Sequence, residues 1–414
     1  MPTDNFKSGI SRKWNLYLVN NMNTIILKPH KEESLLRFHP WVFSGAISRI
    51  KGNPNEGDLV TVRDSIGNIL GCGHYQIGSI AVRILLFGSE SLPPNFWHDR
   101  LQQSYTIRRT LNLIRPDNNC YRLIHGEGDF LPGLVVDIYG ETAVVQAHSV
   151  GMHQVRNEIA KALPNVVEGL KNVYYKSENT LPFKADIPLS EKQDQYLIGS
   201  AQQGEAVENG LRFRIDWLNG QKTGFFIDQR YNRSLLEQYA FNRRVLNMFC
   251  YTGGFSVYAM RGNALGVDSV DSSSKAVDLV RRNMEINFGA DKRHNEYVAD
   301  AFEFMNNIDG KYNLIVLDPP AFAKHRNSIK HALQGYIRLN AKAFKAIDKD
   351  GILFTFSCSQ AIDKEMFRQA VFTAAAQSGR RVRILHQLTQ PADHPINIYH
   401  PEGEYLKGLV LYVE

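Results

Sequence analysis

Hydrophobic and polar positions follow short β-type runs in the first part of the chain. Val60-Thr61-Val62, Ile69-Leu70 and Ile80–Leu85 each belong to a run of strand length, and the turn residues Asp64–Asn68 separate the first two runs. Several short strands joined by glycine-rich turns are typical of a small β-barrel. We therefore expect an N-terminal barrel over residues 24–95, preceded by an extension over residues 1–23 in which Met22 is a candidate translation start.

The middle of the chain mixes both kinds of pattern. Residues 134–145 predict a hairpin, residues 151–162 a helix and Val173–Tyr175 a strand. This mixture indicates a small central α/β domain over residues 96–190. Residues 186–203 are polar, and we expect them to form a linker.

After residue 204 the rhythm changes again. A hairpin with Asn209-Gly210 at its turn comes first, because Asn-Gly favours the tight turns of two-residue hairpins. Apolar strands and amphipathic helices then alternate to about residue 385, which is the pattern of a doubly wound parallel sheet. The predicted fold class is thus α/β, with a Rossmann-like domain over residues 204–414.

Composition narrows the class of protein. The 414 residues are 43% hydrophobic with a net charge of +6, which permits a polyanionic partner without requiring one. Four cysteines without a CxxC pair exclude a disulfide framework and a zinc ribbon, and His394 and His400 have no companion cysteines, so we predict no metal site. No apolar run approaches the ~18 residues of a membrane span, and no signal peptide is recognisable. We expect a reduced, cytoplasmic protein that does not contact membranes.

The first strand of the Rossmann-like domain ends in a glycine turn that can approach a ligand. Residues 245–250 form an apolar strand, followed by Tyr251-Thr252-Gly253-Gly254 and a helix that opens at Phe255. Asp271 ends the next strand 17 residues after Gly254, near the spacing of a ribose-binding acid, and Ser272 can cap the helix that follows. A plain strand-to-helix turn or a dehydrogenase would share these features.

Two later strands end in residues with chemical potential. Residues 312–317 lead into Asp318-Pro319-Pro320-Ala321-Phe322, and residues 351–356 lead into Ser357-Cys358-Ser359. Both ends fall on the carboxyl edge of the sheet, where ligands bind in this fold. If the strands are neighbours, Asp318 and Cys358 face one cleft. The cationic loop with Lys324 and Arg326 suits phosphate contact, or is simply a solvated charge run.

Together these segments resemble a known family. Asp318–Phe322, Ser357–Ser359, Gly220–Arg230 and the tail Ala392–Gly408 are similar to the bacterial large-subunit (23S) rRNA cytosine-C5 methyltransferase family RlmI. The resemblance implies a PUA domain, a class I methyltransferase sheet, S-adenosylmethionine as cofactor and RNA, either 23S rRNA or a large-subunit precursor, as partner. It leaves open whether the chain forms a homodimer.

The resemblance also implies roles for individual residues. Phe249, Tyr251, Gly253 and Gly254 match the cofactor loop, Asp271 and Ser272 the ribose end, and Asp300, which ends the third strand, the adenine contact. Lys222, Thr223, Gln229 and Arg230 are expected near the methionine end, and Asp318 is a further candidate cofactor-binding residue. Pro319, Phe322, Lys324, Arg326 and His394 are the candidate substrate-binding residues.

The chemistry of cytosine C5 points to Cys358. C5 cannot attack a sulfonium directly, whereas a thiolate that adds to C6 makes C5 nucleophilic. We predict Cys358 as this nucleophile, with a lowered pKa, and Asp318 as the catalytic group that holds the cytosine edge. A small buried hydrophobic residue is the other interpretation of Cys358. Position 321 is alanine, so a second catalytic cysteine is absent there, and the base that removes the C5 proton is not identified.

Two other functions fit the same residues. An RNA amino-group methyltransferase acting on guanine or adenine also uses an Asp-Pro-Pro-aromatic loop and needs no cysteine. A non-catalytic RNA-binding protein could retain the cofactor fold, and the aromatic and basic residues of Arg37–Gly45 suit RNA stacking as well as a domain edge.

Overall fold

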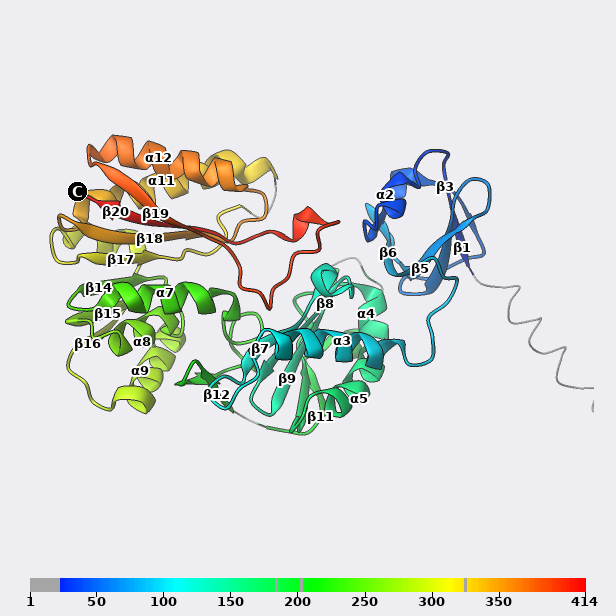
Figure 1. The fold of residues 1–414 in the computed structure, drawn as a ribbon, viewed down its shortest axis with the longest axis horizontal. Coiled ribbons are helices and arrows are strands. Elements are labelled where there is room, and N and C mark those ends of the chain that lie inside the picture. Colours follow the sequence, from blue (N-terminus) through cyan, green and yellow to red (C-terminus); the bar gives the residue numbers. More distant parts are fainter. Residues whose placement is uncertain (1–22, 183–184, 186, 202–203, 324–325) are drawn as a thin grey trace, which may run out of the picture.

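The computed structural model describes residues 23–182, 185, 187–201, 204–323 and 326–414. Apart from Asn23, the predicted N-terminal extension lies outside these residues. The described chain contains four sheets of six, five, two and seven strands, which follow one another along the sequence. Figure 1 shows the N-terminal sheet set apart in space from the seven-stranded sheet. The five-stranded sheet comes between these two in the sequence.

The N-terminal domain is a curled six-stranded sheet of order β2-β6-β5-β4-β1-β3. Its strands are β1 (Thr24–Leu27), β2 (Trp41–Phe43), β3 (Ile47–Lys51), β4 (Leu59–Arg63), β5 (Ile69–Tyr75) and β6 (Ile80–Phe87), with α2 (Glu33–Leu36) and η1 (Ser44–Ala46) between them. Asp64 forms the predicted turn, since its side chain accepts hydrogen bonds from the backbone of Ile66 and Asn68. Apolar residues of the strands, including Val62 and Val82, fill a core of their own.

The central domain is a five-stranded sheet of order β11-β10-β9-β8-β7, covered by helices. Its elements are α3 (Phe96–Thr110), β7 (Cys120–His125), η2 (Gly126–Asp129), β8 (Leu134–Tyr139), β9 (Thr142–Ala147), α4 (Val150–Gln154), α5 (Arg156–Val166), β10 (Asn172–Tyr175), α6 (Leu189–Lys192) and β11 (Gln195–Ile198). The sheet extends past the predicted boundary at residue 190, because β11 pairs antiparallel with β10. The segment that we expected to be a linker is polar because β11 is an edge strand with partly exposed side chains.

The predicted hairpin consists of β12 (Gly204–Glu208) and β13 (Leu211–Ile215). Asn209 and Gly210 at its turn both have positive φ, 50° and 79°, as a type I′ turn requires. The sequence prediction is therefore confirmed here.

The seven-stranded sheet has the order β16-β15-β14-β17-β18-β20-β19. Its strands are β14 (Arg244–Met248), β15 (Gly266–Asp271), β16 (His294–Val298), β17 (Leu314–Leu317), β18 (Gly351–Ser357), β19 (Val382–Leu388) and β20 (Lys407–Val413). The first five strands in this order are parallel, as the alternating pattern predicts, whereas β20 is antiparallel to both of its neighbours. The connection from β19 to β20, red in Figure 1, reaches away from the sheet toward the other domains and contains η6 (Pro401–Gly403).

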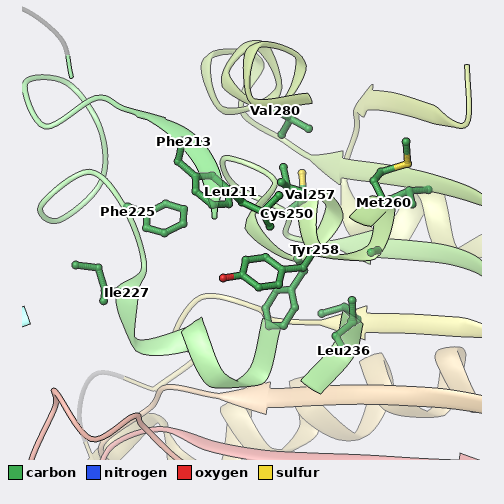
Figure 2. Packing of buried hydrophobic residues seen from close by; sticks show 14 of the residues in the cluster. Leu211, Phe213, Phe225, Ile227, Leu236, Cys250, Val257, Tyr258, Met260 and Val280 are labelled. Carbon is green, nitrogen blue, oxygen red and sulfur yellow. The ribbon is translucent and has the colours of Figure 1, made fainter. Parts of the chain in front are cut away.

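Helices cover both faces of this sheet. They are α7 (Arg230–Ala240), α8 (Gly254–Arg261), α9 (Ser274–Phe288), α10 (Ala301–Phe304), α11 (Ile329–Ala346) and α12 (Lys364–Ser378), with the short turns η3 (Ile227–Gln229), η4 (Met305–Asn307) and η5 (Arg326–Ser328). Successive strand residues point to opposite faces, so Val245 packs with α7–α9, as Figure 2 shows for that core, and Leu246 packs with α10–α12. Among the described helices, none has the length and apolarity that crossing a bilayer requires.

Candidate active site

The turn after β14 has a constrained backbone. Phe249, Tyr251 and Gly253 have φ values of 59°, 46° and 80°, and a non-glycine residue in this region costs about 1–3 kcal/mol. A Cβ atom at Gly253 would lie 2.9 Å from Val280 Cγ1, so the turn packs closely against α9. Gly253 is also the N-cap of α8 and provides no side chain to the first-turn N–H groups. An open helix N-terminus of this kind suits an anionic ligand group.

Of the two acids predicted for the cofactor, Asp271 ends β15 as expected, whereas Asp300 lies two residues beyond the end of β16. Asp271 accepts hydrogen bonds from the backbone of Tyr251 and Ser273, each at 2.9 Å and on different oxygens, so lone pairs remain on both. Asp300 caps α10 and uses only Oδ1 for its two backbone contacts. The predicted cap at Ser272 is wrong: the neighbouring Ser273 accepts from Ala276 N and caps α9, while Ser272 is exposed.

These features fit S-adenosylmethionine. The open N-terminus of α8 would hold the methionine carboxylate, Asp271 the ribose hydroxyls and Asp300 the adenine amino group, in agreement with the donor and acceptor chemistry of each group. The Tyr251 hydroxyl connects this turn to the segment before α7, because it donates to Gly224 O and accepts from Gln221 N. Lys222 lies in this segment with an exposed side chain and a φ of 52°.

Asp318 and Cys358 lie side by side at the carboxyl edge of the sheet. Strands β17 and β18 pair directly in parallel, as the sequence prediction required. The half-buried Cys358 donates from Sγ to Pro319 O at 3.9 Å. On its other side, Asp318 accepts a hydrogen bond at Oδ2 from Gln229 Nε2 at 3.0 Å. The thiol and the carboxylate therefore belong to one site, and Gln229 is part of it.

Burial and like charge set the protonation of both groups. Burial, together with the negative charge of Asp228, raises the pKa of Asp318 to about 7. Burial and the charges of Asp318 and Asp228 raise the pKa of Cys358 to about 12, against a smaller lowering effect of Lys407. Our prediction of a lowered thiol pKa is therefore wrong, because burial and two carboxylates outweigh the nearby cation.

Two of these neighbours were missed by sequence reasoning. Lys407 lies opposite Ser357 in the β18–β20 pairing, and its buried Nζ donates to Ser359 O and Tyr405 O, each at 2.7 Å. Burial lowers the pKa of Lys407 to about 8. Asp228, in η3, accepts at Oδ2 from Tyr405 OH at 2.7 Å. Both could have been noticed in the sequence: Lys407 is a charged residue at the start of an apolar strand, and Asp228 stands next to Gln229. We call Asp228, Asp318, Cys358 and Lys407 the reaction cluster.

The predicted substrate residues have three different outcomes. Pro319 is buried beneath Cys358, and Phe322 is half-buried, with its ring 4.7 Å from that of Tyr336. Lys324 lies outside the described residues, and Arg326 lies in η5 with a side chain that the structure does not describe. His394 is buried with its ring 5.0 Å from that of His125, so we no longer assign it to substrate binding.

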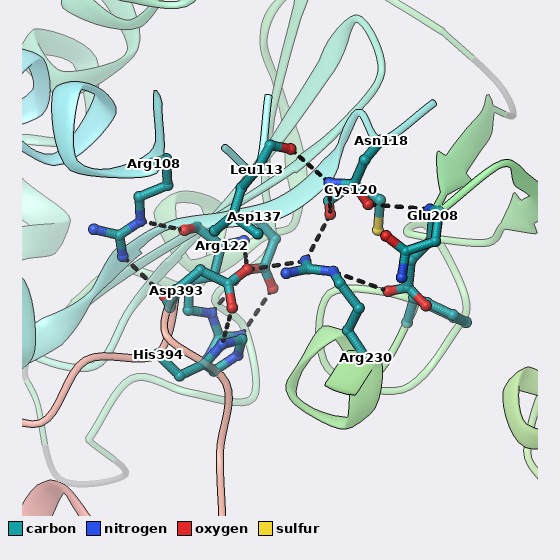
Figure 3. Close-up of polar contacts among 12 residues, drawn as sticks. Arg108, Leu113, Asn118, Cys120, Arg122, Asp137, Glu208, Arg230, Asp393 and His394 are labelled. Atoms are coloured by element: carbon teal, nitrogen blue, oxygen red, sulfur yellow. Dashed lines mark hydrogen bonds and ion pairs between the residues drawn. The ribbon is translucent and has the colours of Figure 1, made fainter. Parts of the chain in front are cut away.

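Three residues predicted at the site instead lie in or against a buried charge network between domains, and Figure 3 shows two of them, Arg230 and His394. Arg230 donates to Asp393 Oδ2 at 2.9 Å and to Cys120 O at 2.7 Å. His394 Nδ1 lies 3.1 Å from Asp393 Oδ1. Thr223, which lies in the same region, donates to Asp137 Oδ2 at 2.6 Å. These side chains are buried and bonded to protein groups, which corrects their assignment to cofactor or substrate.

This interdomain network joins the central sheet to the seven-stranded sheet. Its members are Arg108, Asp129, Arg122, Asp137, Arg230 and Asp393. The charge of Arg230, His394 and a backbone N–H lower the pKa of Asp393 far below its usual range, against the effect of burial. Asp393 is thus a buried anion whose ion pair with Arg230 has a structural role.

A further group of side chains forms where the N-terminal domain meets the β19–β20 connection. His39, His400 and Glu402 place one nitrogen or oxygen each within 4.8 Å of one another. The backbone N–H of Trp41 donates to His39 Nδ1, which puts the ring proton on Nε2, 3.8 Å from Glu402. A metal ligand needs a lone pair at that nitrogen, so the arrangement fits a histidine–carboxylate contact better than a metal site.

Comparison with known proteins adds family information. Residues 192–398 match the family model of S-adenosylmethionine-dependent methyltransferases, and residues 25–87 match that of a PUA-like domain. Two solved structures cover 94% of this chain at 22% identity and show the same fold. One is a candidate SAM-dependent methyltransferase from Streptococcus mutans (TM-score 0.79), and the other is SMU.776, a candidate methyltransferase complexed with SAH (TM-score 0.81); both are covered completely.

Curated relatives are more similar in sequence. The chain is 38% identical to a protein of Tolumonas auensis and 36% identical to one of Klebsiella pneumoniae, each named ribosomal RNA large subunit methyltransferase I. Both alignments cover 94% of this chain and 98% of the relative. The chain therefore belongs to the ribosomal RNA large subunit methyltransferase I family of S-adenosylmethionine-dependent methyltransferases.

Proposed function

We propose that this enzyme methylates C5 of a cytosine in large-subunit ribosomal RNA through a transient bond between Cys358 and C6. The observation that supports this most directly is the position of the Cys358 thiol beside Asp318-Pro319, at the ends of two neighbouring strands. The names of the relatives support the RNA substrate, and the PUA-like domain supports contacts to RNA. Because bacterial ribosomes are assembled in the cytoplasm, this substrate implies a cytoplasmic enzyme.

The reaction needs a thiol because C5 of cytosine is a poor nucleophile. Addition of the Cys358 thiolate to C6 breaks the C5=C6 double bond and places electron density on C5. When bound, S-adenosylmethionine supplies the methyl group and a positively charged sulfonium. The ammonium of Lys407 contributes positive charge near the thiol in the protein itself. Cys358 therefore has a partner that favours its ionised form, although burial opposes ionisation.

Asp318 has the properties of an acid that holds the base. Its pKa of about 7 means that a large fraction of the side chain is neutral at physiological pH. A neutral carboxylic acid can donate a hydrogen bond to N3 of cytosine and draw electrons away from C6. Gln229 fixes the carboxyl group from the other side.

The remaining groups provide binding. We assign Phe249, Tyr251, Gly253, Gly254, Asp271 and Asp300 to the cofactor, and Pro319 and Phe322 to the wall that receives the base. Because the reacting base must leave its stack to reach a strand end inside a protein, we expect a single-stranded or flipped-out cytosine.

Mass spectrometry of ribosomal RNA nucleosides tests the function. A strain that lacks the protein should lose one 5-methylcytidine, and the wild-type gene should restore it. Cys358→Ala should fail to restore it, while Cys72→Ala should succeed, since Cys72 is fully buried in the N-terminal sheet. Loss of a methylated purine, or full activity of Cys358→Ala, would favour an amino-group methyltransferase and contradict the proposed reaction.

A further inference from the structure

Asp228 holds an unused acceptor beside the proposed reaction. Its Oδ1 atom is buried and has no hydrogen-bond partner among the described residues. Its Oδ2 atom accepts from Tyr405 OH at 2.7 Å, so the carboxylate is held in one orientation. Buried acceptors without a partner are rare in folded proteins and cost free energy. An oriented carboxylate with a free oxygen is a common feature of catalytic sites.

The position of Asp228 relates it to both reacting residues. The next residue, Gln229, bonds directly to Asp318. Tyr405, which orients Asp228, is also bonded through its carbonyl oxygen to Lys407. The negative charge of Asp228 acts on both Asp318 and Cys358. These contacts and charges place Asp228 in the reaction cluster together with the thiol and the acid.

We propose that Asp228 is the base that removes the C5 proton, an inference that rests on the proposed C5 methylation. After methyl transfer, C5 has both the new methyl group and its original proton, and C6 is bonded to Cys358 Sγ. Asp228 Oδ1 takes the C5 proton, the C5–H electron pair re-forms the C5=C6 double bond, and the C6–S bond breaks to release the thiolate. The proton then passes from Asp228 to solvent.

The other charged groups of the cluster are less suitable for this step. Asp318 already accepts a hydrogen bond from Gln229, and its neutral form is the one that can hold the cytosine edge. Lys407 uses its ammonium to donate to two carbonyl oxygens. Two neighbouring carboxyl groups whose surroundings differ commonly divide into one acid and one base.

Substitution of Asp228 should trap the intermediate. With radiolabelled S-adenosylmethionine and large-subunit ribosomal RNA from a strain lacking the protein, Asp228→Asn should form a methylated, SDS-resistant protein–RNA adduct. Turnover should fall about 100-fold or more, since a general base contributes roughly that factor. Asp278→Asn, an exposed carboxylate on α9, is the matched control and should turn over normally without an adduct.

A second substrate separates this inference from the proposed function. RNA containing 5-fluorocytidine has no C5 proton to lose, so the wild-type enzyme should form a stable adduct on it through Cys358. Absence of that adduct would overturn C5 methylation itself. If it forms, but Asp228→Asn turns over ordinary RNA at the wild-type rate, Asp228 is not the base.

Titration with S-adenosylmethionine tests the other role available to Asp228. If Asp228→Asn forms no adduct and binds the cofactor at least tenfold more weakly than wild type, Asp228 anchors the cofactor and the inference is wrong. Tyr405→Phe is the milder variant. It keeps the carboxylate but removes the group that orients it, and it should slow adduct release several-fold with cofactor affinity unchanged.

Discussion

The protein contains two clusters of buried charge that differ in how the charges are paired. In the interdomain network every carboxylate faces a guanidinium: Asp137 is held by Arg122 through two hydrogen bonds of 2.8 Å, and Asp393 by Arg230. In the reaction cluster two carboxylates and a thiol share one cationic member, Lys407, which acts on the thiol, while the charge of Arg233 acts on Asp318 from outside the cluster. In the interdomain network each negative charge is balanced by a positive one. In the reaction cluster negative groups lie close together and raise one another's pKa.

This difference in pairing fits a structural role for the interdomain network and a chemical role for the reaction cluster. Pairing with Arg230 drives the pKa of Asp393 down, so this acid remains an anion at all ordinary pH values. Burial and neighbouring negative charge raise the pKa of Asp318 to about 7 and that of Cys358 to about 12, and groups with such shifted pKa values are common at reactive sites. The same short segment, Gly220–Arg230, contributes Arg230 to one cluster and Asp228 to the other.

The largest effect is expected from breaking the interdomain network. Arg230→Met would leave the buried Asp393 without its guanidinium, while Glu208 keeps Arg233, and removal of one partner of a buried ion pair costs about 3–5 kcal/mol. Urea denaturation should show this loss in the free energy of unfolding. Lys171→Met, in an exposed pair with Glu141, is the control and should cost at most about 1 kcal/mol. Equal effects would show that burial of the network is unimportant.

A smaller effect, on activity, is expected at Asp318. Asp318→Asn should reduce methylation about 100-fold at pH 7, since it removes a positioned acid. It should also change how stability depends on pH. The pKa of Asp318 in the folded protein, about 7, lies above its value in the unfolded chain, so the folded state binds the extra proton between about pH 4 and 7.

The sign of this pH effect follows directly. The stability that the neutral Asp318 provides is complete below the unfolded pKa and is lost as the pH rises through about 7. Asp318→Asn lacks this loss, so the difference in unfolding free energy between variant and wild type should grow from pH 4 to 7 and then remain constant. A difference that shrinks as pH rises would place the pKa of Asp318 below its usual value.

The smallest effect is expected on thiol reactivity. At pH 7.5 iodoacetamide should alkylate Cys358 more slowly than a free thiol, because the raised pKa leaves little thiolate. Lys407→Met should slow alkylation further, by up to about tenfold for one pKa unit, and Asp228→Asn should accelerate it. Mass spectrometry of the Cys358 peptide gives the rate, with buried Cys72 as internal reference. Faster alkylation in Lys407→Met would show that the ammonium does not stabilise the thiolate.

The sequence by itself determined the elements and the two strand ends. Apolar periodicity, the Asn209-Gly210 turn and the prolines after Asp318 depend on neighbours within a few residues, so the hairpin, the parallel strands and the position of Cys358 could be predicted. The family segments were also visible as linear motifs, but the motifs did not separate residues that contact ligands from residues that hold the domains together.

Only the tertiary structure decided what those residues do. Arg230 and Asp393 are 163 positions apart and meet in a buried pair, and Asp228 meets Tyr405 across 177 positions. Strand β20 enters antiparallel and brings Lys407 next to Ser357, beside the thiol. Protonation depends on burial and on charges a few ångströms away, whatever their distance along the chain. The sequence therefore identified a cysteine at the end of a strand, and the fold determined the charges that surround it.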